Sequence, residues 1–336
     1  MTDYSAELIA MGEQLKVMGD RLKVIGDDLK PDPVEPPIPP TPTNRILYGA
    51  TYSDPTLPAV MNYKVQAVPA FGWGSTETNL DARIRQMANA EYRVLTACNG
   101  PARFRPSPPG PWNGLGDRIL ASQHQNYANW IAEIVKRHNP SGQKRGLTHV
   151  QLWNELKGYY NQAQNRWDYE GATDLQNKIF DAVKKVDPGV LCGGNYPAMS
   201  KDLPGTGSHK ATNPAINGPW GDSDQRDYDA LKYYFANGKF DFVCVDANLG
   251  CRPWKPDGTL NSPPGTNNAE VARYYTEVAK WIRTQVPNKP IWWSEIYPYV
   301  RGQAMWTTVA EQLKSVPGEH VLMWWAESPY PPPPVN

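Results

Sequence analysis

The feature that most constrains this chain is a regular alternation of short apolar strand patterns with longer amphipathic helical patterns, which begins at Arg45. Strands are predicted at residues 46–52, 65–71, 93–98, 148–153, 190–194, 240–246, 290–294 and 320–325. Helical patterns lie between them at residues 79–89, 118–137, 171–186, 226–236, 269–286 and 305–316. Eight successive β–α units predict an α/β fold whose parallel strands close into a (β/α)8 TIM barrel.

An open, doubly wound sheet is the alternative to a closed barrel. Its usual purpose is nucleotide binding, but no GxGxxG follows the first strand pattern and no GxxxxGK[ST] occurs anywhere in the chain. The barrel is therefore the favoured prediction.

The first 30 residues carry a heptad repeat that predicts a coiled-coil helix. Its apolar positions are Leu8, Leu15, Leu22 and Leu29, with Met11, Met18 and Ile25 three residues after the first three. Leu at one position with Met or Ile at the other favours three or four strands, so we expect a homo-oligomer, a trimer by preference, formed through residues 8–29. An amphipathic helix lying on the chain's own domain or on a partner is the alternative.

A proline-rich stretch at residues 31–44 marks a domain boundary. Prolines at this density exclude regular helix and sheet and favour an extended, semi-rigid spacer. The predicted organisation is therefore a heptad helix at 1–30, a linker at 31–44, the barrel at 45–330 and a proline-rich tail at 331–336. Within the barrel, the long connection at 195–222 is either a lid over the mouth or an ordinary surface loop.

Composition excludes several functions and partners. Lys and Arg balance Asp and Glu, which gives no net charge and a pI near 7.0, so no nucleic-acid partner is expected. The five histidines are scattered without metal-ligand spacing, and neither a metal nor a cofactor is predicted. No apolar run is long enough for a membrane helix, and the N-terminus lacks the pattern of a signal peptide.

The four cysteines fall mostly in predicted strands, which indicates buried free thiols. They are Cys98, Cys192, Cys244 and Cys251. A pairing of Cys244 with Cys251 is left open.

Two glutamates occupy matching places at the ends of aromatic strands. Glu155 follows Asn154 at the end of the fourth predicted strand, and Glu295 follows the seventh. In a (β/α)8 barrel the carboxyl ends of the strands carry the chemistry, and these two strands lie three steps apart around the ring. Two acids that face each other across one pocket are what cleavage of a glycosidic bond requires.

These motifs resemble clan A of the glycoside hydrolases, the retaining (β/α)8 glycosidases. The likeness rests on Asn154 and Glu155 ending strand four, Glu295 ending strand seven, and the tryptophan pair that ends strand eight. It implies that Glu155 is the general acid/base and Glu295 the nucleophile. It also implies that Asn154 hydrogen-bonds the sugar 2-hydroxyl.

The same resemblance extends to further substrate-binding candidates. Tyr297 would orient the nucleophile, and one tryptophan of strand eight, Trp324 by preference, would form the floor of the sugar subsite. The chain departs from the clan where Trp73 replaces an arginine near strand two and where the stretch ending in Asn248 replaces a His or Tyr after strand six. Trp73, Asn248 and Asn99, which follows strand three, complete the set.

An oligomerising helix followed by a proline stalk is similar in layout to bacteriophage tail-associated proteins. This likeness implies a protein made in the host cytoplasm and carried on the virion with other tail proteins, where it degrades a polysaccharide of the bacterial surface or cell wall. Three alternatives remain open. They are a non-catalytic glycan- or receptor-binding module, a structural tail component and a soluble intracellular glycosidase.

Overall fold

The computed structural model describes residues 13, 16, 44–51, 63–107, 117–141, 143–194, 197, 211–216, 223–246, 267–296, 302–325 and 331–333 of the 336-residue chain. By its internal contacts the chain divides into Met1–Thr41 and Pro42–Asn336, and the second unit holds every strand described. Almost all of the predicted heptad helix and linker lies outside the described residues, and so does most of the loop at 195–222. The candidates Asn248 and Tyr297 and the cysteine Cys251 also lie outside them.

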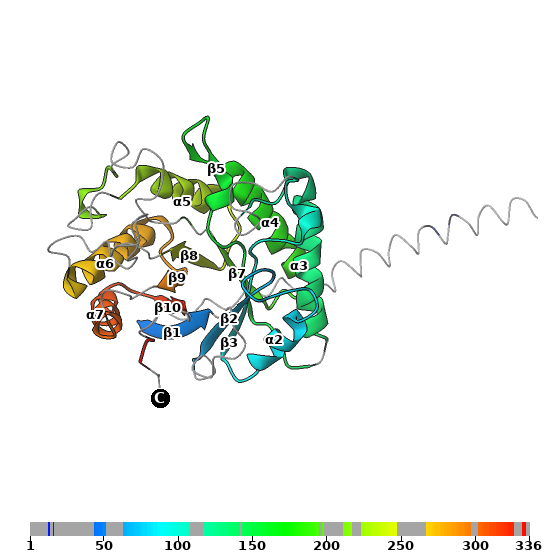
Figure 1. Cartoon of the computed structure of the whole chain (residues 1–336), viewed down its shortest axis with the longest axis horizontal. Helices are drawn as coiled ribbons and strands as arrows, with labels where there is room; N and C mark the ends of the chain where they lie inside the picture. The colour runs from blue at the N-terminus through cyan, green and yellow to red at the C-terminus, as the bar shows by residue number, and fades with distance from the viewer. Residues whose placement is uncertain are drawn as a thin grey trace, which may run out of the picture. The chain divides into compact units, whose positions relative to one another are not determined.

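Eight parallel strands form a closed barrel in the described part of the second unit (Figure 1). They are β1 (Arg45–Thr51), β2 (Val65–Pro69), β3 (Tyr92–Thr96), β4 (His149–Gln151), β7 (Leu191–Gly194), β8 (Phe242–Asp246), β9 (Ile291–Ile296) and β10 (Glu319–Trp325). Around the ring they follow chain order, and β10 pairs with β1 to close it. All eight lie where the sequence predicts them, with ends shifted by at most two residues, so the closed barrel is confirmed over the open sheet.

Helices lie around the ring of strands, as Figure 1 shows. They are α2 (Leu80–Gln86), α3 (His124–His138), α4 (Tyr169–Val186), α5 (Gln225–Asn237), α6 (Asn268–Gln285) and α7 (Ala304–Leu313). Short 3-10 helices are η2 (Ala102–Phe104), η3 (Ala121–Gln123), η4 (Lys157–Tyr159) and η5 (Pro214–Ile216). Each of the six helical patterns in the sequence corresponds to one of these α-helices.

Alternation along each strand divides the core into two layers. In β10, Val321 and Met323 belong to the cluster inside the barrel, whereas Leu322 and Trp324 belong to the cluster between the strands and the helices. Successive side chains of a strand point to opposite faces, so a strand covered on both faces is mostly apolar at both parities. This is why these strands read as continuous apolar runs.

Aromatic rings fill the N-terminal half of the barrel. Phe242 stacks on Trp292 with ring centroids 4.3 Å apart, and His149 lies between Trp292 and Tyr92 at 5.3 and 4.3 Å. Gly193 faces Phe242, and a Cβ there would collide with its ring. Because this end of the barrel is closed by packed side chains, a site has room at the opposite, C-terminal end.

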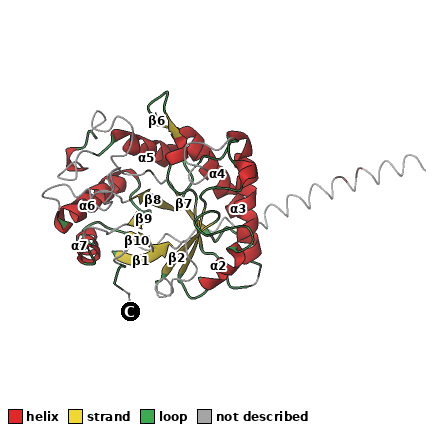
Figure 2. Ribbon diagram, viewed as in Figure 1, coloured by secondary structure: helices red, strands yellow, loops and turns green. Residues whose placement is uncertain are grey.

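A small hairpin that the sequence patterns did not predict follows β4. Its strands are β5 (Tyr160–Asn161) and β6 (Arg166–Trp167), and Figure 2 shows it at the edge of the domain near α4 and α5. Arg226 of α5 donates to the Tyr160 hydroxyl at 2.6 Å and to Asn165 Oδ1 at 2.8 Å. The hairpin is therefore tied to the helix that follows β7.

Candidate active site

The candidate residues that the structure describes lie at the C-terminal ends of the barrel strands. Trp73 follows β2, Asn99 follows β3, and Glu155 follows β4, while Glu295 lies in β9. Because the strands are parallel, these ends share one rim of the barrel. β4 and β9 are separated by β7 and β8, which gives the predicted spacing of three steps between the two glutamates.

Four of these candidates have a backbone conformation that L-residues rarely adopt. Trp73, Asn99, Glu155 and Glu295 have φ values of 43°, 27°, 49° and 55°, and they are four of the five non-glycine residues with positive φ in the described part of the chain. Such a conformation costs on the order of 1–3 kcal/mol per residue and persists where the surrounding structure imposes it. The described residues of this kind are therefore concentrated on one rim of the barrel.

A β-bulge directs Glu295 toward the barrel axis. In β9, Trp292 points inward and Trp293 outward, so regular alternation would place Ser294 inward and Glu295 outward. The register with β10 shifts between Trp293 and Ile296, which inserts one extra residue in β9. Ile296 then resumes the outward position, so the extra residue and the positive φ at Glu295 turn its carboxyl to the inner side.

The charge of Glu295 is felt on the far side of the barrel. The pKa of the Cys98 thiol is raised to about 12, chiefly by burial and with a smaller contribution from the negative charge of Glu295. Cys98 follows β3, which lies four strands from β9 and therefore directly opposite it. An effect across the ring agrees with a carboxylate that points into the mouth.

Asn154 is held in a fixed orientation by a side chain from inside the barrel. Gln151 Nε2 donates to Asn154 Oδ1 at 3.3 Å and to the Trp153 carbonyl at 3.1 Å. Asn154 is only 5% exposed, and its Nδ2 has no hydrogen-bond partner among the described residues. A buried donor without a partner is costly, so this amide is available to a ligand.

Glu155 lies in an apolar setting. It is 4% exposed, and Trp153, Leu156 and Tyr159 beside it are all buried. Trp153 and Tyr159 meet edge to face with ring centroids 5.8 Å apart. These contacts fix the chain segment that carries the acid.

Trp73 sits at the tip of a tight turn on the rim. Gly72 and Ser75 exchange two backbone hydrogen bonds of 2.9 Å, and the two residues between them both have positive φ, the signature of a type I′ turn. The buried Arg83 of α2 holds the turn, because its Nη1 donates to the Trp73 carbonyl at 3.1 Å and to Ser75 Oγ at 2.7 Å.

The structure brings Trp325, not the preferred Trp324, next to Trp73. The rings of Trp73 and Trp325 meet edge to face at 6.0 Å, whereas Trp324 contacts Tyr63 and belongs to the core between the strands and the helices. Trp325 has the parity of the inward-facing Met323, so it is the member of the tryptophan pair that lies on the rim.

A third acid, Asp246, ends β8 beside the bulge. It is fully buried, pairs in register with Ser294, and has the inward parity of Phe242 and Cys244.

Cys98, Cys192 and Cys244 are buried free thiols, as the sequence indicated. Burial raises the pKa of the thiols at Cys98, Cys192 and Cys244, which keeps these groups protonated.

No group of three or more His, Cys, Asp or Glu among the described residues is arranged to hold a metal ion. No helix among them is both long enough and apolar enough to span a membrane.

Comparison with known proteins gives matches only among solved structures. No family model and no curated protein matches the chain. A GH5_18 protein from Streptomyces cattleya, solved in complex with Manb1-4GlcNAc, is similar with a TM-score of 0.51 and 12% identity over 83% of this chain and 70% of that one.

Two further structures have TM-scores of 0.49. A monomeric β-xylosidase from Caulobacter crescentus is 14% identical over 87% of this chain and 63% of that one, and a glucosidase from Croceicoccus marinus is 12% identical over 84% and 60%. This chain thus spans about three fifths of the length of these two. Taken with the closed parallel ring, the comparison shows a fold that glycoside hydrolases of the (β/α)8 type share.

Proposed function

We propose that the barrel is a retaining glycoside hydrolase in which Glu295 is the nucleophile and Glu155 the general acid/base. The observation that carries the proposal is the bulge in β9, which turns a buried glutamate inward on the rim where a second buried glutamate follows β4. Bulges next to active sites serve to redirect one side chain. The strained backbone at both glutamates supports the same assignment.

The reaction would proceed by double displacement. The ionised Glu295 attacks the anomeric carbon while the protonated Glu155 gives its proton to the departing glycosidic oxygen, which leaves a covalent glycosyl-enzyme. Glu155, now ionised, takes a proton from water. The resulting hydroxide attacks the anomeric carbon and releases Glu295, with net retention of configuration.

The surrounding residues would bind and orient the sugar. Asn154 Nδ2, which Gln151 leaves free to donate, is placed to bond the sugar 2-hydroxyl. Trp73 is half-buried and lies against Trp325, so the two rings offer an aromatic wall for the apolar face of a sugar ring. Asn99 occupies the strand end between those of Trp73 and Asn154.

Turnover of polysaccharides tests the assignment. Wild-type protein is incubated with xylan, mannan, mixed-linkage β-glucan and purified bacterial sacculi, and released reducing ends are measured. We expect hydrolysis of at least one polymer, and a loss of about a thousandfold or more in kcat for Glu295→Gln and Glu155→Gln. Glu311→Gln, the same change on an exposed carboxyl of α7, is the control.

One outcome would contradict the proposal. If wild-type protein and Glu295→Gln bind the same polymer and are equally inert, the barrel is a non-catalytic glycan-binding module.

We further propose that three copies display the barrel on a bacteriophage tail and act on a glycan of the bacterial surface. The basis is the sequence of residues 8–29, with its strict heptads, and the proline-rich stretch that follows. Light scattering on the full chain should give the mass of three 37.6 kDa subunits. Leu15→Asp with Leu22→Asp should reduce it to one subunit, and a wild-type monomer would exclude the trimer.

A further inference from the structure

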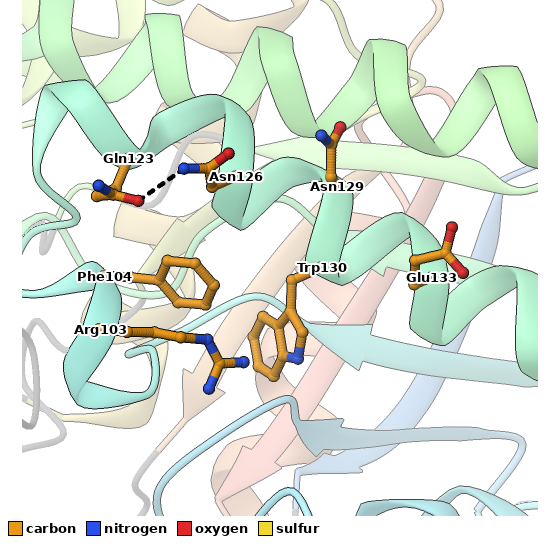
Figure 3. Close-up of a pocket in the computed structure, with 7 residues that line it drawn as sticks. All are labelled: Arg103, Phe104, Gln123, Asn126, Asn129, Trp130 and Glu133. Atoms are coloured by element: carbon orange, nitrogen blue, oxygen red, sulfur yellow. Dashed lines mark hydrogen bonds between the residues drawn. The ribbon is translucent and has the colours of Figure 1, made fainter.

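A groove on the outside of the barrel is lined by residues that the proposed reaction does not use. It lies between η2 and the first half of α3 and has a volume of about 460 Å³. Figure 3 shows its lining, which consists of Arg103, Phe104, Gln123, Asn126, Asn129, Trp130 and Glu133. The volume is in the range of small-ligand sites, which is about 300–1,000 Å³.

The groove has an aromatic floor that is held in place. Trp130 packs against Phe104 at 5.9 Å and against Tyr127 at 5.4 Å between ring centroids. At the edge of this floor the Glu77 carboxylate accepts two hydrogen bonds from Arg103, at 2.7 and 2.9 Å. The hydrogen bond from Arg103 lowers the pKa of Glu77, so these two side chains form an ion pair beside the aromatic floor.

Neutral amides form the rim of the groove. Gln123, Asn126, Trp130 and Glu133 recur at helical spacing and therefore share one face of the chain as it enters and follows α3, with Asn129 beside them. Asn126 Nδ2 donates to Gln123 Oε1 at 2.8 Å, the dashed line in Figure 3. An amide offers both donors and acceptors, which matches the hydroxyls of a sugar.

The charges of the lining do not favour an anionic ligand. The guanidinium of Arg103 is engaged by Glu77, and the other charged group of the lining, Glu133, is negative. A phosphate or nucleic acid would need unpaired positive charge. Fixed aromatic surface together with neutral amides is instead the chemistry of a neutral sugar chain.

The groove adjoins the proposed active site. Tyr127 of α3 donates from its hydroxyl to the carbonyls of Cys98 and Asn99, both at 3.1 Å, at the end of β3. The same ring contacts Trp130 on the groove side and Trp153, which precedes Asn154, at 6.0 Å. One aromatic side chain therefore separates the groove from the strand ends that carry Asn99 and Asn154.

We infer that this groove is a second glycan-binding site, which holds a polysaccharide chain beside the barrel mouth. The inference rests on the proposed function for the identity of the ligand class. Arg103, Asn126, Asn129 and Glu133 are exposed, so the groove is open along its length and suits a polymer that continues beyond it.

Binding is tested in the full chain carrying Glu295→Gln, so that no substrate is consumed. Affinity gel electrophoresis in xylan, mannan and mixed-linkage β-glucan, and co-sedimentation with purified bacterial sacculi, give the dissociation constant for each polymer. We compare Trp130→Ala and the pair Asn126→Ala with Asn129→Ala. The amide pair is exposed on a helix, where alanine favours folding, so its effect is not one of misfolding.

A matched control is Trp281→Ala in α6. Trp281 is half-buried like Trp130 and also contacts two aromatic rings, those of Tyr228 and Phe235, but it is remote from the groove lining. We expect the dissociation constant to rise about tenfold or more for Trp130→Ala and severalfold for the amide pair, with Trp281→Ala unchanged.

Two results would overturn the inference. One is an unchanged dissociation constant in both groove variants, and the other is the absence of binding to every polymer. If the groove variants lose binding to a polymer while the wild-type protein hydrolyses none of the polymers, the proposed hydrolase fails and the glycan-binding groove stands.

Discussion

The backbone conformation of Glu295 predicts that a glycine variant at this position is more stable than an alanine variant, the reverse of the usual order. Alanine normally stabilises a strand position relative to glycine by roughly 0.5–1 kcal/mol, because glycine loses more conformational freedom on folding. At a φ of 55° an L-residue carries a steric cost of roughly 1–2 kcal/mol that glycine does not. Both Glu295→Gly and Glu295→Ala remove the carboxyl, so the difference between them isolates the backbone.

The entropic cost of glycine and the steric cost of an L-residue at positive φ oppose each other, and the steric cost is the larger. We therefore expect Glu295→Gly to have a free energy of unfolding about 1 kcal/mol higher than Glu295→Ala, which for a unit of this size corresponds to about 2 °C in Tm. The same pair of substitutions at Glu155, with a φ of 49°, should give the same sign.

Differential scanning calorimetry of the two pairs measures the effect. Ser294 is the internal control, because it is also buried in β9 but is not among the residues with positive φ. At Ser294 we expect the usual order of stability, with a higher Tm for Ser294→Ala than for Ser294→Gly. Alanine variants that equal or exceed the glycine variants at both Glu155 and Glu295 would refute the assigned bulge and strained strand end.

Three other predictions concern the site and the barrel interior. Gln151→Met keeps the packing but releases Asn154, and kcat/KM on the hydrolysed polymer should fall about tenfold with little change in Tm; an unchanged kcat/KM contradicts the positioning role. Gly193→Ala should lower the free energy of unfolding by about 1–3 kcal/mol, because its Cβ meets the Phe242 ring, and urea denaturation measures this. Burial lowers the pKa of His149 to about 3, so the folded chain keeps this ring neutral where the unfolded chain protonates it. Stability should thus be lost as the pH falls from about 6.5 toward 3, by about 1.4 kcal/mol per pH unit for this group, and His149→Asn should flatten the dependence of Tm on pH; an equal slope in both proteins would exclude His149 as the cause.

The barrel could be predicted from the sequence because each strand is covered on both faces. A strand such as β8 is apolar at every position up to Asp246, and its helix neighbours carry one apolar face each. The apolar strand runs and the helical repeats can therefore both be recognised in the sequence. The placement of Glu155 and Glu295 at strand ends follows from the same alternation.

The details that shape the site could not be predicted from the sequence in the same way. The bulge at Glu295 and the turn at Trp73 depend on backbone angles that glutamate and tryptophan rarely adopt, so residue preference argues against them. The hairpin β5–β6 is only two residues wide on each side and relies on Arg226, far along the chain, to hold it. Such tertiary contacts leave no periodic signal in the sequence.

The choice between Trp324 and Trp325 could not be made from the sequence. Trp324 and Trp325 are chemically equivalent in the sequence, and only their parity relative to Met323 separates them. Because β10 is apolar on both faces, only the structure shows which of the two tryptophans points inward.

The anomeric configuration of the first-formed product tests the central assignment most directly. Proton NMR is recorded within the first minutes of hydrolysis of the polymer that the wild-type protein cleaves, before mutarotation mixes the anomers. Attack by Glu295 followed by water activated by Glu155 predicts that the new reducing end has the configuration of the bond that was cut. A product of the opposite configuration, or the same rate of cleavage by Glu295→Gln, would contradict the account.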